Sequence, residues 1–166
     1  MTTAPLIVIA HNIRSTHNIG AIFRTCEGFG VEKLFLTGYS PYPTTVNDQR
    51  LPHIRDKLTT QISKTALGTE TSVTFEHRES IEDLLEDLRH QNYEIVGLEQ
   101  DDNSVLLPEY TAPGAVALLL GEEVHGITAT LRDLCDDLIE IPMLGKKESF
   151  NVSVACGIAL YGLRYQ

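Results

Sequence analysis

The sequence has few of the residues that staple small proteins together. Its three cysteines, Cys26, Cys135 and Cys156, are far apart and form no Cys-x-x-Cys pair. An odd number of cysteines at this spacing argues against a disulfide framework or a zinc site and fits a reducing compartment. A domain of 166 residues can bury roughly 70% of the surface of its unfolded chain, so it needs no such staple.

Long hydrophobic runs are also missing. The apolar runs are too short to cross a bilayer, and the N-terminus lacks the basic segment followed by an apolar one that marks a signal peptide. We therefore expect a cytoplasmic protein that has no contact with membranes.

Positive charge is scarce. The chain has 13 Lys and Arg against 23 Asp and Glu, a net charge of −10, whereas proteins that bind nucleic acids usually present a basic surface. The acidic residues concentrate in residues 76–102, whereas Arg14, Arg24, Arg50, Arg55, Lys57 and Lys64 all lie in the first 64 residues. This asymmetry permits RNA binding on one face, and it equally fits ordinary solvated charge.

Several common catalytic motifs are absent. No Gly-x-Gly-x-x-Gly opens a helix, and the sequence contains neither a phosphate-binding loop nor a nucleophile elbow. Ser15, Ser149 and Ser153 have no recognisable histidine and carboxylate partners. The sequence thus argues against a conventional dinucleotide enzyme, a P-loop enzyme and a serine hydrolase.

The pattern of apolar residues predicts a single α/β domain over residues 1–166. Short apolar runs at 6–10, 34–37, 95–98 and 115–120 are typical of strands that are covered on both faces. Helical spacing occurs at 19–26, from Ser80 onward and at 151–165. The alternation predicts a mostly parallel sheet with helices on both faces. Residues 38–55, which contain three prolines, read as an exposed loop, either functional or an ordinary excursion.

Three segments that follow predicted strands hold polar residues and glycines, and ligands of open α/β sheets bind at that edge. The first, residues 11–25, contains Asn12, Arg14, Asn18 and Arg24. Arginine offers a fork of donors that suits phosphate. Asn18 can equally serve as a helix cap.

The second segment has Gly121 and Gly126 on either side of Glu123, which can anchor a loop or bind a cation; an ordinary turn explains the glycines equally well. His125 has no second His or Cys at ligand spacing, so we expect no metal site. The third segment runs from Ile141 through a glycine loop to a helix start with Ser149 and Asn151, which suits a polar ligand or a simple cap.

Taken in order, the three segments resemble the motifs of the SpoU, or TrmH-type, branch of the SPOUT RNA methyltransferases. The matching strings are Asn12-x-Arg14-x-x-x-Asn18-x-Gly20-x-x-x-Arg24-Thr25, then Gly121-x-Glu123-x-x-Gly126, then Ile141-Pro142-Met143 with Ser149-Phe150-Asn151-Val152-Ser153-Val154-Ala155. Residues 64–68 also resemble the connecting segment of the family. Each string is weak alone, but their order and separation are specific and span nearly the whole chain.

The resemblance implies a trefoil knot near the C-terminus, S-adenosylmethionine as the cofactor without a metal, and a homodimer. In the family, residues of the first motif meet the cofactor of the partner subunit. The residues that match the cofactor site are Leu98, Gly121, Gly126, Ile141, Met143, Ser149, Phe150 and Asn151. Phe150 departs from the leucine that is usual there, which puts only the fit of the pocket in question.

The implied activity is methyl transfer to a ribose 2′-hydroxyl of tRNA or rRNA. The implied catalytic residues are Arg24, Asn18, Glu123, Ser149 and Asn151; Asn12, Arg14 and Arg24 are expected to contact RNA. We expect no separate RNA-binding extension, so RNA recognition falls to this domain, its dimer partner or an accessory subunit. The alternatives are a non-catalytic RNA-binding or assembly protein with the same knotted fold, and an enzyme of this fold that methylates a base.

Overall fold

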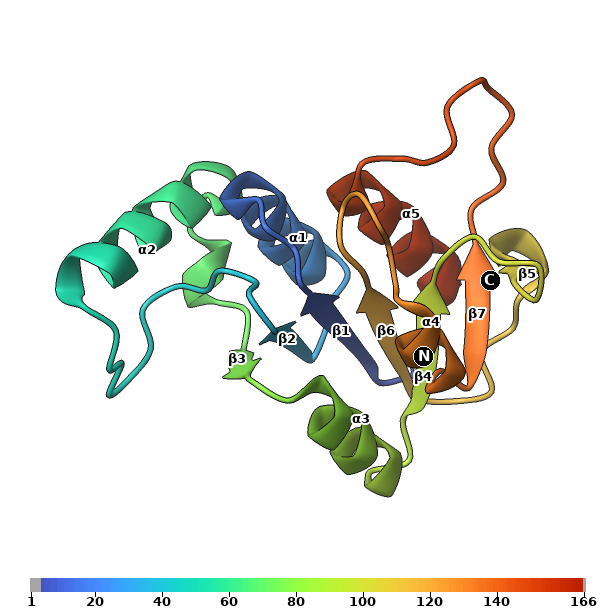
Figure 1. Ribbon diagram of the computed structural model, residues 1–166, viewed down its shortest axis with the longest axis horizontal. Coiled ribbons are helices and arrows are strands. Elements are labelled where there is room, and N and C mark those ends of the chain that lie inside the picture. The colour runs from blue at the N-terminus through green and yellow to red at the C-terminus, as the bar shows by residue number, and fades with distance from the viewer. Residues whose placement is uncertain (1–3, 166) are drawn as a thin grey trace.

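The apolar runs of the sequence form the middle of a parallel sheet. A computed structural model of the chain describes residues 4–165. Its seven strands lie in the order β3-β2-β1-β6-β4-β7-β5, and every ladder is parallel (Figure 1). The strands are β1 (Leu6–His11), β2 (Lys33–Thr37), β3 (Phe75–Arg78), β4 (Glu94–Leu98), β5 (Val105–Leu106), β6 (Val116–Leu120) and β7 (Asp137–Glu140).

Helices cover both faces of the sheet, because successive strand residues point to opposite sides. In β1, Val8 belongs to one core cluster, while Ile7 and Ile9 belong to the other. The first cluster receives α1 (Thr16–Gly28), α2 (Pro52–Ala66) and α5 (Val152–Tyr165); the second receives α3 (Ile81–His90) and α4 (Ala129–Asp133) (Figure 1). The predicted α/β architecture is confirmed. Short 3₁₀ turns at Thr69–Thr71 and Leu107–Glu109 complete the elements.

The predicted strands and three of the helices are confirmed, but the helix α2 was not predicted. The loop expected over residues 38–55 ends at Leu51, so the prediction is wrong for its last four residues, which form the start of α2. Pro52 opens the helix, a position where its missing N–H and fixed φ are compatible with helical structure. Only Ile62 and Ala66 of α2 are buried, so the sequence shows little of the periodicity that marks a helix.

The contact between α1 and α2 depends on Gly20. A Cβ at this position would lie 2.0 Å from Thr65 Oγ1 and 2.3 Å from the Ile62 carbonyl oxygen. The Thr65 hydroxyl donates to the His17 carbonyl at 2.8 Å, which fastens the two helices at the same point. Gly20 therefore serves the packing of the first motif.

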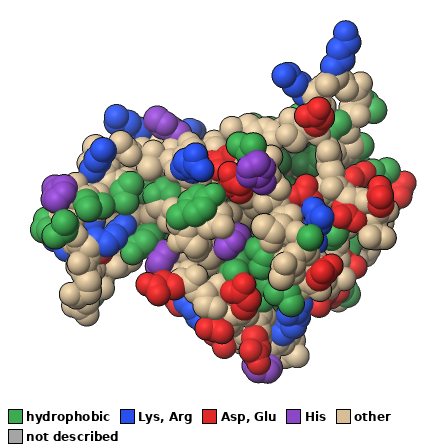
Figure 2. Space-filling model, in the orientation of Figure 1, with side chains coloured by type: hydrophobic (Ala, Val, Ile, Leu, Met, Phe, Trp, Pro, Cys, Tyr) green, Lys and Arg blue, Asp and Glu red, His purple; other side chains and the backbone are tan. Residues whose placement is uncertain are grey.

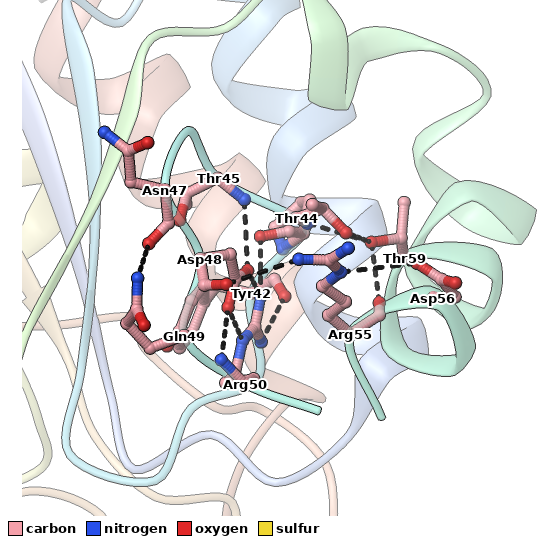
Figure 3. Close-up of polar contacts among 11 residues, drawn as sticks. Tyr42, Thr44, Thr45, Asn47, Asp48, Gln49, Arg50, Arg55, Asp56 and Thr59 are labelled. Carbon is pink, nitrogen blue, oxygen red and sulfur yellow. Dashed lines mark hydrogen bonds and ion pairs between the residues drawn. The ribbon is translucent and has the colours of Figure 1, made fainter. Parts of the chain in front are cut away.

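The loop 38–51 is also less exposed than expected, since Ser40, Pro41 and Pro43 are buried. Arg50 fixes it from inside: its guanidinium donates to both carboxylate oxygens of Asp48 and to the carbonyls of Tyr42 and Pro43 (Figure 3). The hydrogen bonds from Arg50 hold the pKa of Asp48 well below its usual range.

The Tyr42 ring packs between Arg50 and His77. It lies 3.6 Å from the Arg50 guanidinium carbon and stacks on His77 of β3 with ring centroids 4.2 Å apart. The loop is thus attached to the edge of the sheet.

Within residues 4–165, no helix combines the length and hydropathy that a membrane span requires. The trefoil knot stays a prediction.

The Arg50 contacts generate a first prediction. Arg50→Lys keeps the charge but removes the planar fork, so it cannot satisfy Asp48 and two carbonyls together. We expect amide hydrogen exchange to accelerate in residues 38–51 while the exchange of β1 and β6 stays slow. Arg78→Lys, in a partly exposed ion pair with Asp87, is the matched control and leaves the loop protected. Unchanged exchange in the loop of the Arg50 variant contradicts the assignment.

Candidate functional site

A cavity of about 290 Å³ lies where β4, β6 and β7 end. The loops after these strands form its walls, and those after β6 and β7 rise from the same edge of the sheet (Figure 1). Parallel strands bring their carboxyl ends together at one edge, and ligands of open α/β sheets bind there. Its volume is close to the lower end of the range for small-molecule sites.

All of the predicted cofactor residues except Asn151 line this cavity: Leu98, Gly121, Gly126, Ile141, Met143, Ser149 and Phe150. Leu120, Val152 and Ala155 add apolar surface. These residues come from three separate loops and are spread over more than 50 positions of the sequence, yet they line one cavity. The role of each residue stays a prediction.

The charge of the cavity suits a cationic ligand. Its lining contains no Lys or Arg and five glutamates: Glu99, Glu122, Glu123, Glu140 and Glu148. Opposite charges attract strongly in a site with little water. A sulfonium and an ammonium group, both present in S-adenosylmethionine, fit this set of carboxylates, and the apolar walls fit an adenine ring. Residues 4–165 contain no group of three or more His, Cys, Asp or Glu side chains arranged to hold a metal ion.

The two glycines of the second motif are required by the loop itself. Glu122 and Gly126 exchange two backbone hydrogen bonds of 3.1 and 2.9 Å. A Cβ on Gly121 would lie 2.4 Å from the carbonyl carbon of Gly126. Gly126 has φ +65°, and a Cβ there would lie 2.0 Å from Glu99 Oε2. These contacts support the ordinary turn that the sequence left open as an explanation of the glycines, and both glycines also line the cavity.

Glu99 is a lining residue that the sequence motifs did not indicate. Its carboxylate accepts the N–H of Ile127 at 2.7 Å and the N–H of Gln100 at 2.9 Å. It therefore joins the end of β4 to the loop that follows β6. The available signal was its position directly after the apolar run that ends at Leu98.

Glu123 anchors the first motif to the second. Its carboxylate accepts the backbone N–H groups of Arg14 and Ser15, each at 3.1 Å, and Nδ2 of Asn18 at 3.2 Å. Burial acts to raise the pKa of Glu123, but these donors outweigh it and hold the pKa below its usual value of 4.5. The cap of α1 is Ser15, which accepts the N–H of Asn18, so the amide of Asn18 is free for other contacts.

Asn18 extends the contact to the third motif. Its Oδ1 accepts Nδ2 of Asn151 at 3.1 Å, and Asn151 Oδ1 accepts the N–H of Ser153 at 2.9 Å, which caps α5. A continuous line of hydrogen bonds thus runs from Glu123 through Asn18 to Asn151. Of the predicted catalytic residues, Asn18 contacts both Glu123 and Asn151, and Ser149 lines the cavity.

Arg24 lies apart from this group. It is exposed on α1 and lines a separate hollow with Ser153, Val154, Gly157 and Tyr161. Its side chain makes no hydrogen bond or ion pair within the described part of the chain, residues 4–165. The fold of one subunit therefore does not bring Arg24 to the cavity.

The remaining predicted RNA contacts have different environments. Asn12 is half-buried, and its Oδ1 accepts the N–H of Tyr39 at 3.1 Å. Arg14 is exposed, with its guanidinium carbon 6.0 Å from the centroid of the Tyr39 ring. Asn12 thus shapes a loop, whereas Arg14 presents its charge to solvent.

Comparison with known proteins places this geometry in a family context. The model of the SpoU rRNA Methylase family matches residues 5–161. The 23S rRNA (guanosine-2'-O-)-methyltransferase RlmB of Coxiella burnetii is 30% identical over 99% of this chain and 60% of its own length. The tRNA (guanosine(18)-2'-O)-methyltransferase of Aquifex aeolicus is 32% identical over 97% of this chain and 69% of its own. The chain thus spans 60% of the Coxiella relative.

Solved structures agree with the fold. The TrmH/SpoU tRNA modifying enzyme of Aquifex aeolicus superposes with a TM-score of 0.78 at 28% identity, over 96% of this chain and 73% of that one. An AdoMet-bound rRNA methyltransferase from Sinorhizobium meliloti gives a TM-score of 0.79 at 22% identity, over 97% and 56%. The second likeness concerns the fold alone.

The environment of Glu123 generates a second prediction. Because its pKa is lowered in the folded state, its stabilising effect is complete above about pH 4.5 and is lost as the pH falls through the lower folded value. We expect Glu123→Gln to melt below the wild type at pH 7, and the gap to close as the pH falls below the ordinary range of a glutamate. Thermal unfolding across this range measures it. Glu27→Gln, exposed on α1, is the control; a gap that does not depend on pH contradicts the role of the carboxylate.

Proposed function

The chain belongs to the SpoU rRNA methylase family, and from this premise we propose that it transfers a methyl group from S-adenosylmethionine to a ribose 2′-hydroxyl of tRNA or rRNA. The observation that carries the proposal is the line of hydrogen bonds from Glu123 through Asn18 to Asn151. It joins all three motifs beside a cavity whose carboxylates and apolar walls suit the cofactor. Relatives named as 2'-O-methyltransferases support it.

When bound, S-adenosylmethionine would supply an electrophilic methyl group on a positively charged sulfur. The glutamates of the cavity would attract that charge, and residues of the loops at 121–126 and 141–150 would hold the ligand. Methyl transfer to a ribose hydroxyl would require this chain to hold that oxygen in line with the methyl group, while the hydroxyl proton passes to water or to a neighbouring phosphate of the RNA. Positioning therefore supplies much of the rate acceleration.

In this proposal Arg24 holds the ribose and its neighbouring phosphate. A guanidinium has a pKa above about 12 and stays protonated, so it suits an oxygen-rich substrate better than it suits the role of a base. Its fork of donors can reach a phosphate and a ribose oxygen together. Arg24 has no partner within residues 4–165, which leaves these donors available for substrate.

We also propose that the protein acts as a homodimer through α1 and α5. Arg24 and the cavity are separate in one subunit, and the hollow around Arg24 borders exposed apolar side chains on α5. Val154, Tyr161 and Tyr165 are 50%, 62% and 67% exposed, and exposed apolar patches of this kind mark interfaces. A symmetric contact there brings Arg24 of each subunit toward the cavity of the other.

The cellular setting follows from the proposed substrate. The relatives from Coxiella burnetii and Aquifex aeolicus are bacterial RNA methyltransferases, so the proposal locates the protein in the cytoplasm. The net charge of −10 opposes phosphate binding, which leaves a role for a basic accessory subunit that shares in holding the RNA.

A third prediction tests Arg24. Arg24→Ala is expected to bind S-adenosylmethionine as the wild type does in calorimetry, because in this proposal the side chain holds the ribose and phosphate and not the cofactor. Its transfer of labelled methyl to bulk tRNA or rRNA should fall by at least about 100-fold. Arg24→Lys, which keeps the charge without the fork, should be intermediate, and Lys57→Ala on the exposed side of α2 is the control.

The possible outcomes separate the candidate functions. Methylation by Arg24→Ala at the wild-type rate removes Arg24 from the mechanism. A wild-type protein that binds no S-adenosylmethionine indicates a non-catalytic RNA-binding or assembly protein. Nucleoside analysis that finds the methyl group on a base instead of the ribose indicates a base methyltransferase.

A fourth prediction tests the shared site. Gly126→Val should close the cavity, because its Cβ meets Glu99 and its φ is +65°; calorimetry checks that cofactor binding is lost. A purified heterodimer of Arg24→Ala and Gly126→Val subunits retains one complete site of two if the sites cross the interface, so it should show about half of the wild-type rate. Either homodimer should be inactive. An inactive heterodimer contradicts the crossed arrangement.

A further inference from the structure

A second groove lies on the same edge of the sheet as the cavity. It has a volume of about 520 Å³ and is formed by the loop after β1, the start of the loop after β2, and α2. Its lining contains no Asp or Glu, although the chain has 23. Figure 2 shows acidic side chains gathered at the bottom of the view, around α3, and basic ones over α2. The groove is thus a non-acidic region on an acidic protein.

The groove and the cavity share one wall. Glu123 lines the cavity and accepts the backbone N–H groups of Arg14 and Ser15, which line the groove. A polymer bound across this wall passes from the cavity to the groove over a single layer of protein residues. A polymer whose reacting unit enters the cavity therefore has its neighbouring units within reach of the groove.

Tyr39 offers a flat aromatic surface in this groove. Its side chain is 52% exposed, yet its backbone is held firmly, because its N–H donates to Asn12 Oδ1. Gly38 makes the contact possible: it has φ +62°, and a Cβ there would lie 1.9 Å from Asn12 Oδ1. An exposed ring on a fixed backbone loses little entropy when a flat ligand stacks on it.

Arg14 is the available cation of the groove. Arg50 also lines it, but its donors are taken by Asp48 and by the carbonyls of Tyr42 and Pro43 (Figure 3). Arg14 is exposed, and its side chain makes no hydrogen bond or ion pair among the residues that the structure describes. Its guanidinium carbon lies over the Tyr39 ring, 6.0 Å from the centroid, so an aromatic ring and a positive charge without a carboxylate partner occupy one spot.

We propose that this groove binds a nucleotide of the RNA next to the one that is methylated. Its base stacks on Tyr39 and its phosphate pairs with Arg14. A stacked base and a paired phosphate are the two contacts by which proteins hold unpaired nucleotides. The substrate class is therefore RNA whose target lies in a loop or single strand, where neighbouring bases are free to unstack. This inference rests on the proposed function for the identity of the polymer.

The fifth prediction uses a short fluorescent single-stranded RNA of mixed sequence, titrated over a range of salt concentrations. Tyr39→Ala should bind it roughly 10-fold or more weakly, whereas Tyr39→Phe keeps the ring and should bind as the wild type does. Neither changes the salt dependence. Arg14→Ala should lower the slope of log affinity against log salt by about 0.7, the value for one phosphate contact on a single strand.

Lys57→Ala is the matched control for charge. It removes one positive charge from α2 at a position outside the groove lining, and it should leave both affinity and salt slope unchanged. A second readout needs no affinity: RNA that contains 4-thiouridine should crosslink on irradiation to the tryptic peptide of residues 34–50, which carries Tyr39. The crosslink should be lost in Tyr39→Ala.

Failure of the groove and failure of the proposed function give different results. Wild-type RNA binding that Tyr39→Ala leaves intact, or equal weakening by Tyr39→Phe and Tyr39→Ala, overturns the stacking site while methyl transfer stands. A wild-type protein that binds no RNA also overturns it. Binding that follows the groove variants without any methyl transfer supports the groove and removes the proposed activity.

Discussion

The site depends on the side-chain amide of Asn18. Its nitrogen donates to Glu123 and its oxygen accepts from Asn151, so one group satisfies a carboxylate on one side and an amide on the other. A carboxylate cannot donate and an ammonium group cannot accept, whereas an amide does both from two separate atoms and so suits this point. The three partners belong to segments that follow β1, β6 and β7. Without Asn18, the bonds from Arg14 and Ser15 to Glu123 still join the first two segments, but the line of hydrogen bonds to Asn151 is broken.

The order of the strands in the sheet places the three loops side by side. β1 and β6 are neighbours, and β4 separates β6 from β7, so the carboxyl ends of four consecutive strands lie side by side. Their apolar side chains are buried on both faces, which fixes the strand ends and leaves only the loops to be positioned. Two carboxylates do this work: Glu123 ties the loop after β6 to α1, and Glu99 ties it to β4. The loop is held at both ends before any ligand enters.

The sequence predicted those elements whose signal is local. Apolar runs marked the central strands, and the spacing around Ile22 and Leu84 marked α1 and α3, because burial on one face imposes a period. α2 gave no such signal, since it buries only Ile62 and Ala66. The packing of the loop 38–51 depends on Arg50, Tyr42 and His77, contacts between distant residues that no local pattern encodes. The motifs of the site could be recognised in the sequence by their order and separation. Glu99 belongs to no motif and could not be recognised in this way.

The distribution of charge explains how an acidic protein can bind RNA, a polyanion, in the proposed reaction. Five glutamates line the cavity, where a cationic cofactor would meet them, and Glu123 accepts the backbone N–H groups of Arg14 and Ser15 between this cavity and the groove of Arg14 and Tyr39. With 13 Lys and Arg against 23 Asp and Glu, we expect phosphate contacts to supply only a small share of the affinity. Stacking and the shape of the loop must supply the rest. Such a protein discriminates against regular duplex, whose bases are already stacked and paired, and selects RNA by which nucleotides are free to leave the stack.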